Sequence, residues 1–280
     1  MANPAAASSR FGTLASRLLV ALPGIALFIA VVLLNIGPLT VGFFSLIAAL
    51  AGGEAASLLK PGISRSMKML YAGFTGLAAA AVSIRTAVPP MPLLLSAGGL
   101  LAVILVLRYG VEGAGRYAAG TMGAVAVISG GFALLGRLRT DFPSPWVIFI
   151  PLLICWLGDT LAYFVGSAAG RHKMAPSISP AKSWEGFAAG LAGSVAGAVL
   201  AGSLGAGFSA VAMVITGLLG GCAAVAGDLL ESALKRNAGV KDSGSLLGGH
   251  GGVLDRFDSV LAVVPVVWVL LTLFSDSGLL

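Results

Sequence analysis

The stretch SALKRNAGVKDSGSLLGGHGGVLDRFDS, residues 232–259, separates two apolar segments of the chain. It contains four basic residues, three aspartates, a histidine and six glycines, whereas only 10% of the whole chain is charged. Charged side chains are costly inside a membrane or an apolar core unless they are paired or bind something. The stretch therefore predicts a polar loop between two membrane-spanning helices, with a binding site for a charged molecule at the membrane surface.

The composition of the whole chain predicts an all-α, polytopic integral membrane protein. Of its 280 residues, 58% are hydrophobic and 10% are charged, whereas a water-soluble domain carries about 25% charge. The net charge of +6 comes from basic residues in short loops between apolar segments, without the long basic tail typical of nucleic-acid binding. Cys155 and Cys222 lie in apolar runs without the spacing of a disulfide framework or a zinc site. We therefore expect the lipid bilayer, and no nucleic acid, as a partner.

The apolar segments predict nine transmembrane helices, since a helix needs about 20 apolar residues to cross a bilayer. The expected spans are residues 18–35, 38–59, 69–87, 91–108, 117–136, 145–167, 186–206, 209–230 and 259–274. We interpret the first as an uncleaved span, because it is long for the apolar part of a signal peptide. Residues 1–140 would hold the first five helices, and residues 141–280 the catalytic region of a single membrane domain.

Basic residues are distributed unevenly between the two sides of this topology. Fourteen of the 17 Lys and Arg residues fall on the side of the amino terminus, and Arg85, Arg137 and Arg139 fall on the other. Cytoplasmic loops of membrane proteins carry an excess of Lys and Arg. The sequence therefore predicts a multi-pass protein of the cell (inner) membrane with a cytoplasmic amino terminus. Its active site would face the cytoplasm through the loops 168–185 and 231–258.

Carboxylates are concentrated at the two helix ends that flank the polar stretch. Asp228, Glu231 and Lys235 follow one another at intervals of three and four residues, which places them on one helical face. Asp255 and Asp258 are spaced in the same way at the start of the last span. One or two carboxylates together with substrate phosphate oxygens commonly hold Mg²⁺. The pairing favours a metal and phosphate site over a set of solvated charges.

Basic and glycine-rich positions between these carboxylates are suited to phosphate binding. GGHGG, residues 248–252, allows backbone amides to approach an anion closely, although it lacks the pattern of a P-loop. His250 would donate a hydrogen bond to a phosphate. Four basic side chains can compensate phosphate charge: Lys235, Arg236, Lys241 and Arg256.

A second polar segment follows the sixth predicted span. SISPAKSWEG, residues 177–186, contains Ser179 and Lys182, which can form a short phosphate-facing turn. Asp159 in the sixth span and Glu54 in the second are ionisable residues in apolar helices, and such residues are often functional. For Asp159 we favour function over an internal polar contact. For Glu54 both interpretations remain open.

The seventh predicted span carries glycines at intervals of three and four residues, which allows a neighbouring helix to pack closely. These glycines are Gly186, Gly190, Gly193 and Gly197. We interpret the face as a packing surface. Small-residue faces of this kind are also compatible with a homodimer.

The polar stretch resembles a known family signature. SALKR at 232–236, KD at 241–242 and LGGHGGVLDRFD at 247–258 are similar to the signature of the phosphatidate cytidylyltransferases, also called CDP-diacylglycerol synthases. DTLAYFVG at 159–166 and SPAKSWEG at 179–186 resemble further blocks of that family. The resemblance is specific in the second half of the chain. In the first half only the number of spans and the apolar character agree.

The resemblance implies transfer of the cytidylyl group of CTP to phosphatidic acid in phospholipid biosynthesis, with CDP-diacylglycerol and pyrophosphate as products. It implies Mg²⁺, accompanied by a monovalent cation such as K⁺, on Asp228 and Asp255, with Asp258 as a weaker candidate ligand. The catalytic residues that it implies are Asp228, Asp255 and Lys241. The substrate-binding residues that it implies are Ser179, Lys182, Lys235, Arg236, His250 and Arg256. It does not divide the basic residues between CTP and the lipid.

Two other classes of function remain open at this point. A CTP-dependent polyprenol or dolichol kinase would need the same metal and basic residues, but its alcohol acceptor would also need a general base. The complete signature argues against it. A membrane transporter fits the nine spans with Glu54 and Asp159 inside them, but the charges gather in two loops and no inverted repeat is evident.

Overall fold

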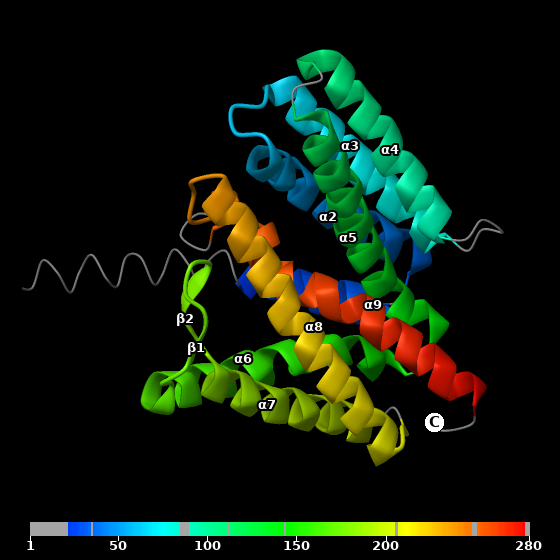
Figure 1. The fold of residues 1–280 in the computed structure, drawn as a ribbon. Coiled ribbons are helices and arrows are strands. Elements are labelled where there is room, and N and C mark those ends of the chain that lie inside the picture. The colour runs from blue at the N-terminus through cyan, green and yellow to red at the C-terminus, as the bar shows by residue number, and fades with distance from the viewer. Residues whose placement is uncertain are drawn as a thin grey trace, which may run out of the picture.

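The structure of the chain is a computed structural model that describes residues 22–34, 36–84, 90–110, 113–142, 144–204, 207–247 and 251–277. These residues form a bundle of long helices with a small β-hairpin at one end (Figure 1). The prediction of an all-α integral membrane protein is confirmed. His250, a predicted substrate-binding residue, lies outside the described residues.

Each predicted span overlaps a described helix, although residues 18–21, 35, 85–87 and 205–206 of the predicted spans lie outside the described residues. A short apolar helix, Leu22–Leu34, precedes the labelled elements. These are α2 (Gly37–Leu59), α3 (Arg65–Ser83), α4 (Pro90–Tyr109), α5 (Ala114–Asp141), the 3₁₀ turn η1 (Pro145–Ile148), α6 (Phe149–Ala169), β1 (Lys173–Ala175), β2 (Ser179–Ser183), α7 (Trp184–Ser203), α8 (Ala210–Asn237) and α9 (Leu254–Asp276).

The number of fully apolar helices is smaller than the nine predicted spans. Within the described residues, seven helices are long and apolar enough to cross a membrane. The helix Leu22–Leu34 is shorter than these, and α3 is less apolar. α3 starts at Arg65, four residues before the predicted span, because the Ser64 hydroxyl accepts a hydrogen bond from the Met67 amide at 3.4 Å and caps the helix. Its first turn therefore includes Arg65 and Lys68.

The segment between α6 and α7 is a β-hairpin, and the predicted turn at Ser179 is wrong. β1 pairs with β2 in antiparallel fashion, with Lys173 opposite Ser183 and Ala175 opposite Ser179. The chain then passes directly into α7, where the Ser183 hydroxyl accepts a hydrogen bond from the Gly186 amide at 3.2 Å. Serine and proline favour turns locally, but cross-strand hydrogen bonds are not visible in local composition.

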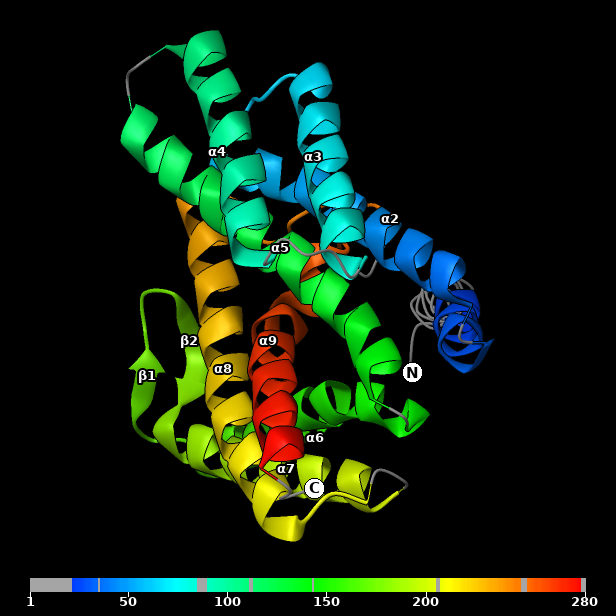
Figure 2. The same ribbon diagram turned by 90° about the vertical axis from the view of Figure 1, so that its right-hand side faces the viewer.

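α6 and α7 run side by side as a closely packed pair (Figures 1 and 2). The predicted glycine face of α7 is buried against α6. A Cβ on Gly193 would collide with the Leu157 carbonyl oxygen, and one on Gly197 with that of Leu153. The interpretation of this face as a packing surface is confirmed. Because the face is used within the chain, it gives no support for the predicted homodimer.

Replacing Gly193 by leucine should lower the melting temperature of the protein markedly. The new side chain would overlap the backbone of α6, and overpacking typically costs about 1–3 kcal/mol, sometimes more. Thermal unfolding in detergent would measure the effect. Gly99→Leu in α4 is the matched control, because a Cβ at Gly99 meets nothing within 4 Å. Equal melting temperatures for the two variants would contradict the packing interpretation.

α5 occupies the centre of the bundle and contacts α2, α3, α4 and α9. The rings of Phe132 in α5 and Phe257 in α9 meet edge to face, with centroids 5.1 Å apart. At the far end, the Trp268 indole of α9 donates to the Asp141 carboxylate of α5 at 3.0 Å. Arg137 donates to the same carboxylate at 3.0 Å. These contacts set the position of α9, and hence of the polar residues at its start.

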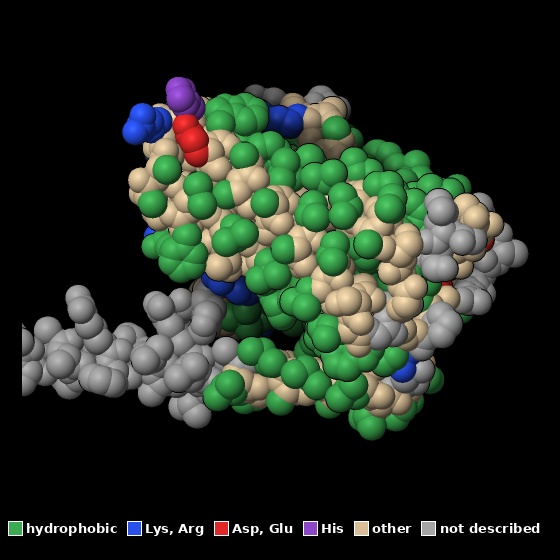
Figure 3. Space-filling view, turned by 90° about the horizontal axis from the view of Figure 1, so that it is seen from below, with side chains coloured by type: hydrophobic (Ala, Val, Ile, Leu, Met, Phe, Trp, Pro, Cys, Tyr) green, Lys and Arg blue, Asp and Glu red, His purple; other side chains and the backbone are tan. Residues whose placement is uncertain are grey.

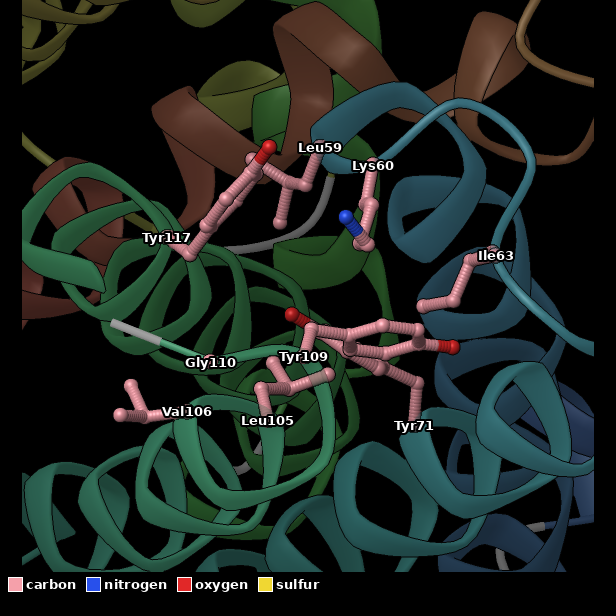
Figure 4. Close-up of a pocket in the computed structure, with 9 residues that line it drawn as sticks. All are labelled: Leu59, Lys60, Ile63, Tyr71, Leu105, Val106, Tyr109, Gly110 and Tyr117. Carbon is pink, nitrogen blue, oxygen red and sulfur yellow. The ribbon is translucent and has the colours of Figure 1, made fainter. Parts of the chain in front are cut away.

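Aromatic and basic side chains join four helix ends on one side of the bundle (Figure 4). The Lys60 ammonium lies 4.6 Å from the ring centroid of Tyr109 and 4.9 Å from that of Tyr117. The hydroxyl of Tyr109 also contacts the Ser64 hydroxyl at 3.4 Å. Tyrosine and basic residues are enriched where membrane proteins meet water. The cluster therefore joins the ends of α2, α3, α4 and α5, and its composition is typical of a membrane surface.

Candidate active site

Three segments that are distant in sequence meet at one end of the bundle. The C-terminal end of α8, the N-terminal end of α9 and the β-hairpin all lie on the left in Figure 1. α8 extends to Asn237, beyond the predicted span 209–230, so Asp228, Glu231 and Lys235 lie on one continuous helix. The loop between α8 and α9 turns back over this end. The polar residues that the sequence singled out are therefore presented on one side of the molecule.

Asp255 holds the loop through both oxygens of its carboxylate. The Ser243 amide donates to Oδ1 at 3.1 Å and to Oδ2 at 2.9 Å, and the Gly252 amide donates to Oδ2 at 2.8 Å. Lys235 donates to Oδ1 at 2.9 Å. The side chain of Asp255 is only 5% exposed. Its carboxylate therefore joins the end of α8 to both ends of the loop.

Glu54 supports the same loop from α2. Its carboxylate accepts hydrogen bonds from the amides of Val253 at 3.0 Å and Leu254 at 2.8 Å, and from the Ser243 hydroxyl at 3.2 Å. Val253 and Leu254 begin α9, and helix N-termini favour negative charge. Of the two interpretations left open for Glu54, the described contacts are those of an internal partner. Its effect on function would come through the position of the loop.

A buried line of alternating charge runs along the end of α8. The Lys235 ammonium lies 2.7 Å from Glu231 and 2.9 Å from Asp255. The other oxygen of Glu231, Oε1, is buried and has no hydrogen-bond partner among the described residues. The carboxyl group of Glu231 also lies next to that of Asp258. Unpaired buried carboxylate oxygens are costly, so this pair is a place where a cation would be stabilised.

Lys182 joins the hairpin to α8. Its ammonium lies 2.5 Å from Asp228 Oδ2, and the Ser232 hydroxyl donates to Asp228 Oδ1 at 3.2 Å. Asp159 on α6 lies within electrostatic range of Asp228, Asp258 and Lys182. The structure therefore places Lys182 beside the polar stretch, and its role in substrate binding stays a prediction. The described part of the site thus brings five carboxylates and two lysines together.

The remaining predicted residues lie around this cluster. Ser179 is paired with Ala175 in the hairpin. Arg236 is exposed and donates to the Val240 carbonyl oxygen at 3.5 Å. Lys241 is exposed on the loop. Arg256 is also exposed, and it lines an apolar groove beside the site.

The donor set suits Mg²⁺ in its chemistry. Among the described residues there is no group of three His, Cys, Asp or Glu side chains arranged to hold a metal ion. Mg²⁺, however, needs only one or two carboxylates and takes water and phosphate oxygens for its other ligands. Asp228, Asp258 and the unpaired Glu231 oxygen provide such ligands. Both oxygens of Asp255 already accept hydrogen bonds.

Ser243 was not predicted from the sequence, although it contacts both Glu54 and Asp255. A serine in a polar loop is ordinary composition, so no local signal distinguishes it. Glu231 was placed on the correct helical face but was not predicted as a ligand. The spacing to Asp228 and Lys235 was a signal that could have identified it.

Comparison with known proteins finds a matching family and similar sequences. The sequence matches the cytidylyltransferase family model over residues 15–274. It is 45% identical over 136 residues to the phosphatidate cytidylyltransferase of Bacillus subtilis, covering 46% of this chain and 48% of that protein. It is 38% identical over 192 residues to that of Brucella abortus biovar 1, covering 67% and 69%. For the Mycobacterium bovis protein of the same name the identity is 39% over 130 residues, covering 46% and 42%.

The alignments span about half the length of the Bacillus and Mycobacterium proteins and about two thirds of the Brucella protein. The family model covers more, because it includes the first helices as well as the polar stretch. On this match from residue 15 to residue 274, the chain belongs to the cytidylyltransferase family.

Proposed function

We propose that this protein transfers the cytidylyl group of CTP to phosphatidic acid, forming CDP-diacylglycerol and pyrophosphate. Family membership supports the proposal, as do the relatives from Bacillus and Brucella, whose names state this activity. The observation that carries it is the contact between Lys182 and Asp228 at 2.5 Å. It joins two polar segments into one charged site at the end of an apolar bundle, where a lipid and a nucleotide can meet.

In the proposed reaction, a phosphate oxygen of phosphatidic acid attacks the α-phosphorus of CTP in line. The new P–O bond forms as the bond to the bridging oxygen breaks, and pyrophosphate leaves with that electron pair. The attacking oxygen is already anionic at neutral pH, so no general base is needed. Catalysis would rest on positioning and charge neutralisation. The basic side chains of the hairpin and the loop would supply both.

We propose Mg²⁺ as the cofactor, with a monovalent cation such as K⁺ beside it. Asp228 and Asp258 would hold these ions. Glu231 Oε1, which has no hydrogen-bond partner among the described residues, would provide a further ligand. Asp255 would join them only if an ion replaced one of its hydrogen bonds. When bound, the divalent ion would neutralise charge on the phosphates.

We propose that the site faces the cytoplasm of a cell (inner) membrane. The support is the excess of Lys and Arg on the amino-terminal side of the predicted topology, fourteen residues against three. CTP is a cytosolic solute, so a site on this side could be supplied directly. A homodimer remains a prediction that the glycine face of α7 does not support.

Product analysis of the purified protein tests the proposed function. With phosphatidic acid, labelled CTP and Mg²⁺, it should form a CDP-lipid and pyrophosphate, and chelation of Mg²⁺ should stop the reaction. CDP with a phosphorylated lipid alcohol would instead indicate a kinase. If neither product forms in lipid-containing detergent or reconstituted membranes, the proposal is wrong.

Lys241→Ala should raise the KM for CTP while the protein stays folded. Lys241 is exposed on the loop, so its loss leaves no buried group unpaired, and a charge-assisted bond to phosphate contributes about 1.5–3 kcal/mol. That corresponds to a KM about ten- to a hundredfold higher. Lys68→Ala, which removes a cation from α3, is the control. An unchanged CTP dependence would assign Lys241 to the lipid or to no substrate.

A further inference from the structure

An apolar groove lies next to the candidate active site. It has a volume of about 670 Å³, within the range of about 300–1,000 Å³ typical of small-molecule sites. The helix Leu22–Leu34 and α2 form one wall, and α6, α9 and the end of the loop form the other. Its lining includes Ile25, Phe28, Leu50, Trp156, Arg256 and Phe257.

Arg256 is the charged residue among the described groove-lining side chains. It follows Asp255 directly in the first turn of α9, so the charged end of the groove adjoins the carboxylate cluster. Figure 3 shows a hollow between the narrow strip that continues from the grey amino-terminal trace and the main body, with Lys or Arg side chains (blue) at its edge. One end of the groove is therefore basic and the rest is apolar.

The groove is accessible from the side that the bilayer would cover. Ile25 on the first helix is 55% exposed and Trp156 on α6 is 56% exposed, although both line the groove. Large exposed hydrophobic side chains are expected where a helix faces lipid. A lipid could therefore enter the groove laterally, without leaving the membrane.

We infer that this groove binds an acyl chain of phosphatidic acid and that Arg256 binds the phosphate of the same lipid. The inference rests on the proposed function and divides the basic residues between the two substrates. Lys182 and Lys235 lie inside the carboxylate cluster, where the nucleotide and the ions would bind, whereas Arg256 lines the groove. A guanidinium group suits a lipid phosphate, because its donors match two phosphate oxygens at once.

The groove would act by shape and position. An acyl chain that moves from the bilayer into an apolar groove gains little hydrophobic free energy, because the lipid that it leaves is equally apolar. The groove would fix the acyl chain at a set distance from Arg256. The lipid phosphate would then lie at a set distance from the carboxylate cluster. The attacking oxygen is held beside the nucleotide in this way.

Photo-crosslinking with a phosphatidic acid that carries a diazirine in one acyl chain tests the inference directly. In nanodiscs, the label should attach to groove residues such as Phe28, Trp156 or Phe257. Excess unlabelled phosphatidic acid should compete, whereas phosphatidylcholine should not. Arg256→Gln should reduce the label at least severalfold and Arg256→Lys should reduce it less. Label found only outside the groove overturns the inference, whether the groove is filled by residues 1–21 or by a second copy of the chain.

A filling substitution gives a second, kinetic readout. Leu50→Trp places a larger side chain in the groove and should raise the KM for a long-chain phosphatidic acid about fivefold or more. The KM for CTP should not change, and dihexanoyl phosphatidic acid should be affected less. The control is Leu46→Trp on the same helix, which is 60% exposed and does not line the groove. Equal kinetics for the two variants would overturn the inference.

These measurements test the inferred lipid site and the proposed reaction separately. If no CDP-lipid forms but the acyl chain labels the groove in competition with phosphatidic acid, the lipid site stands and the reaction is wrong. If CDP-lipid forms while the label and the Leu50→Trp kinetics show no groove effect, the reaction stands and the inferred lipid site is wrong.

Discussion

Asp228→Asn should lower the rate of CDP-diacylglycerol formation by about 10²- to 10³-fold, the size of effect seen when one electrostatic group is removed from an active site. Asp228 Oδ2 lies 2.5 Å from the Lys182 ammonium, and Oδ1 accepts from the Ser232 hydroxyl at 3.2 Å. Asparagine keeps the shape but removes the charge that holds Lys182 and would attract a cation. Initial rates with labelled CTP and saturating Mg²⁺ would measure the loss.

The side chain of Asp228 is 30% exposed, so the substitution leaves no deeply buried charge without a partner. Asp276→Asn at the other end of α9 is the matched control and should keep the rate of the unmodified protein. Asp255→Asn is a less specific test, because Asp255 is 5% exposed and pairs with Lys235. Removing one member of a buried pair costs about 3–5 kcal/mol of stability. A normal rate in the Asp228 variant would exclude this carboxylate from the site.

Glu54→Gln should reduce activity at least about tenfold, although Glu54 lies on α2 and acts through the loop. The carboxylate accepts three hydrogen bonds, two of them from the first amides of α9. A hydrogen bond to a charged acceptor contributes about 1.5–3 kcal/mol, and glutamine presents a single neutral acceptor oxygen. Amide hydrogen exchange should accelerate at Val253 and Leu254, and this measurement reports the loop independently of activity.

Ser57→Ala provides the control on the same helix, because the Ser57 hydroxyl donates within the helix to the Gly53 carbonyl oxygen at 3.5 Å. It should leave both activity and exchange unchanged. If Glu54→Gln lost activity without faster exchange at the start of α9, Glu54 would have a direct role in the site. If neither quantity changed, the loop would not depend on these hydrogen bonds.

The helices were predictable because membrane insertion depends on local composition. An apolar run of about 20 residues must satisfy its backbone within itself, and in lipid a helix is the simplest way to do so. Every predicted span therefore has its helix. The start of α3 and the β-hairpin were not predicted correctly, since the first depends on a cap at Ser64 and the second on pairing between strands.

The site was predictable where its residues share a helical face or a motif. Asp228, Glu231 and Lys235 are aligned by helical spacing alone, and α8 indeed continues through them. The contribution of Lys182 was expected from the resemblance, and the structure supplies the contact. Glu54 and Ser243 meet across 189 positions of the chain. Neither spacing nor composition carries information about such a contact.

The sequence by itself determined that this protein lies in a membrane, that its helices are separated by polar loops and that the charged stretch at residues 232–259 belongs to a cytidylyltransferase signature. These are properties of hydropathy and of a local motif. Only the tertiary structure decided that Glu54 holds this stretch, that Lys182 reaches Asp228 and that Arg256 borders an apolar groove. The reason is physical: contacts between helices depend on how their faces pack, and packing is a property of the whole bundle.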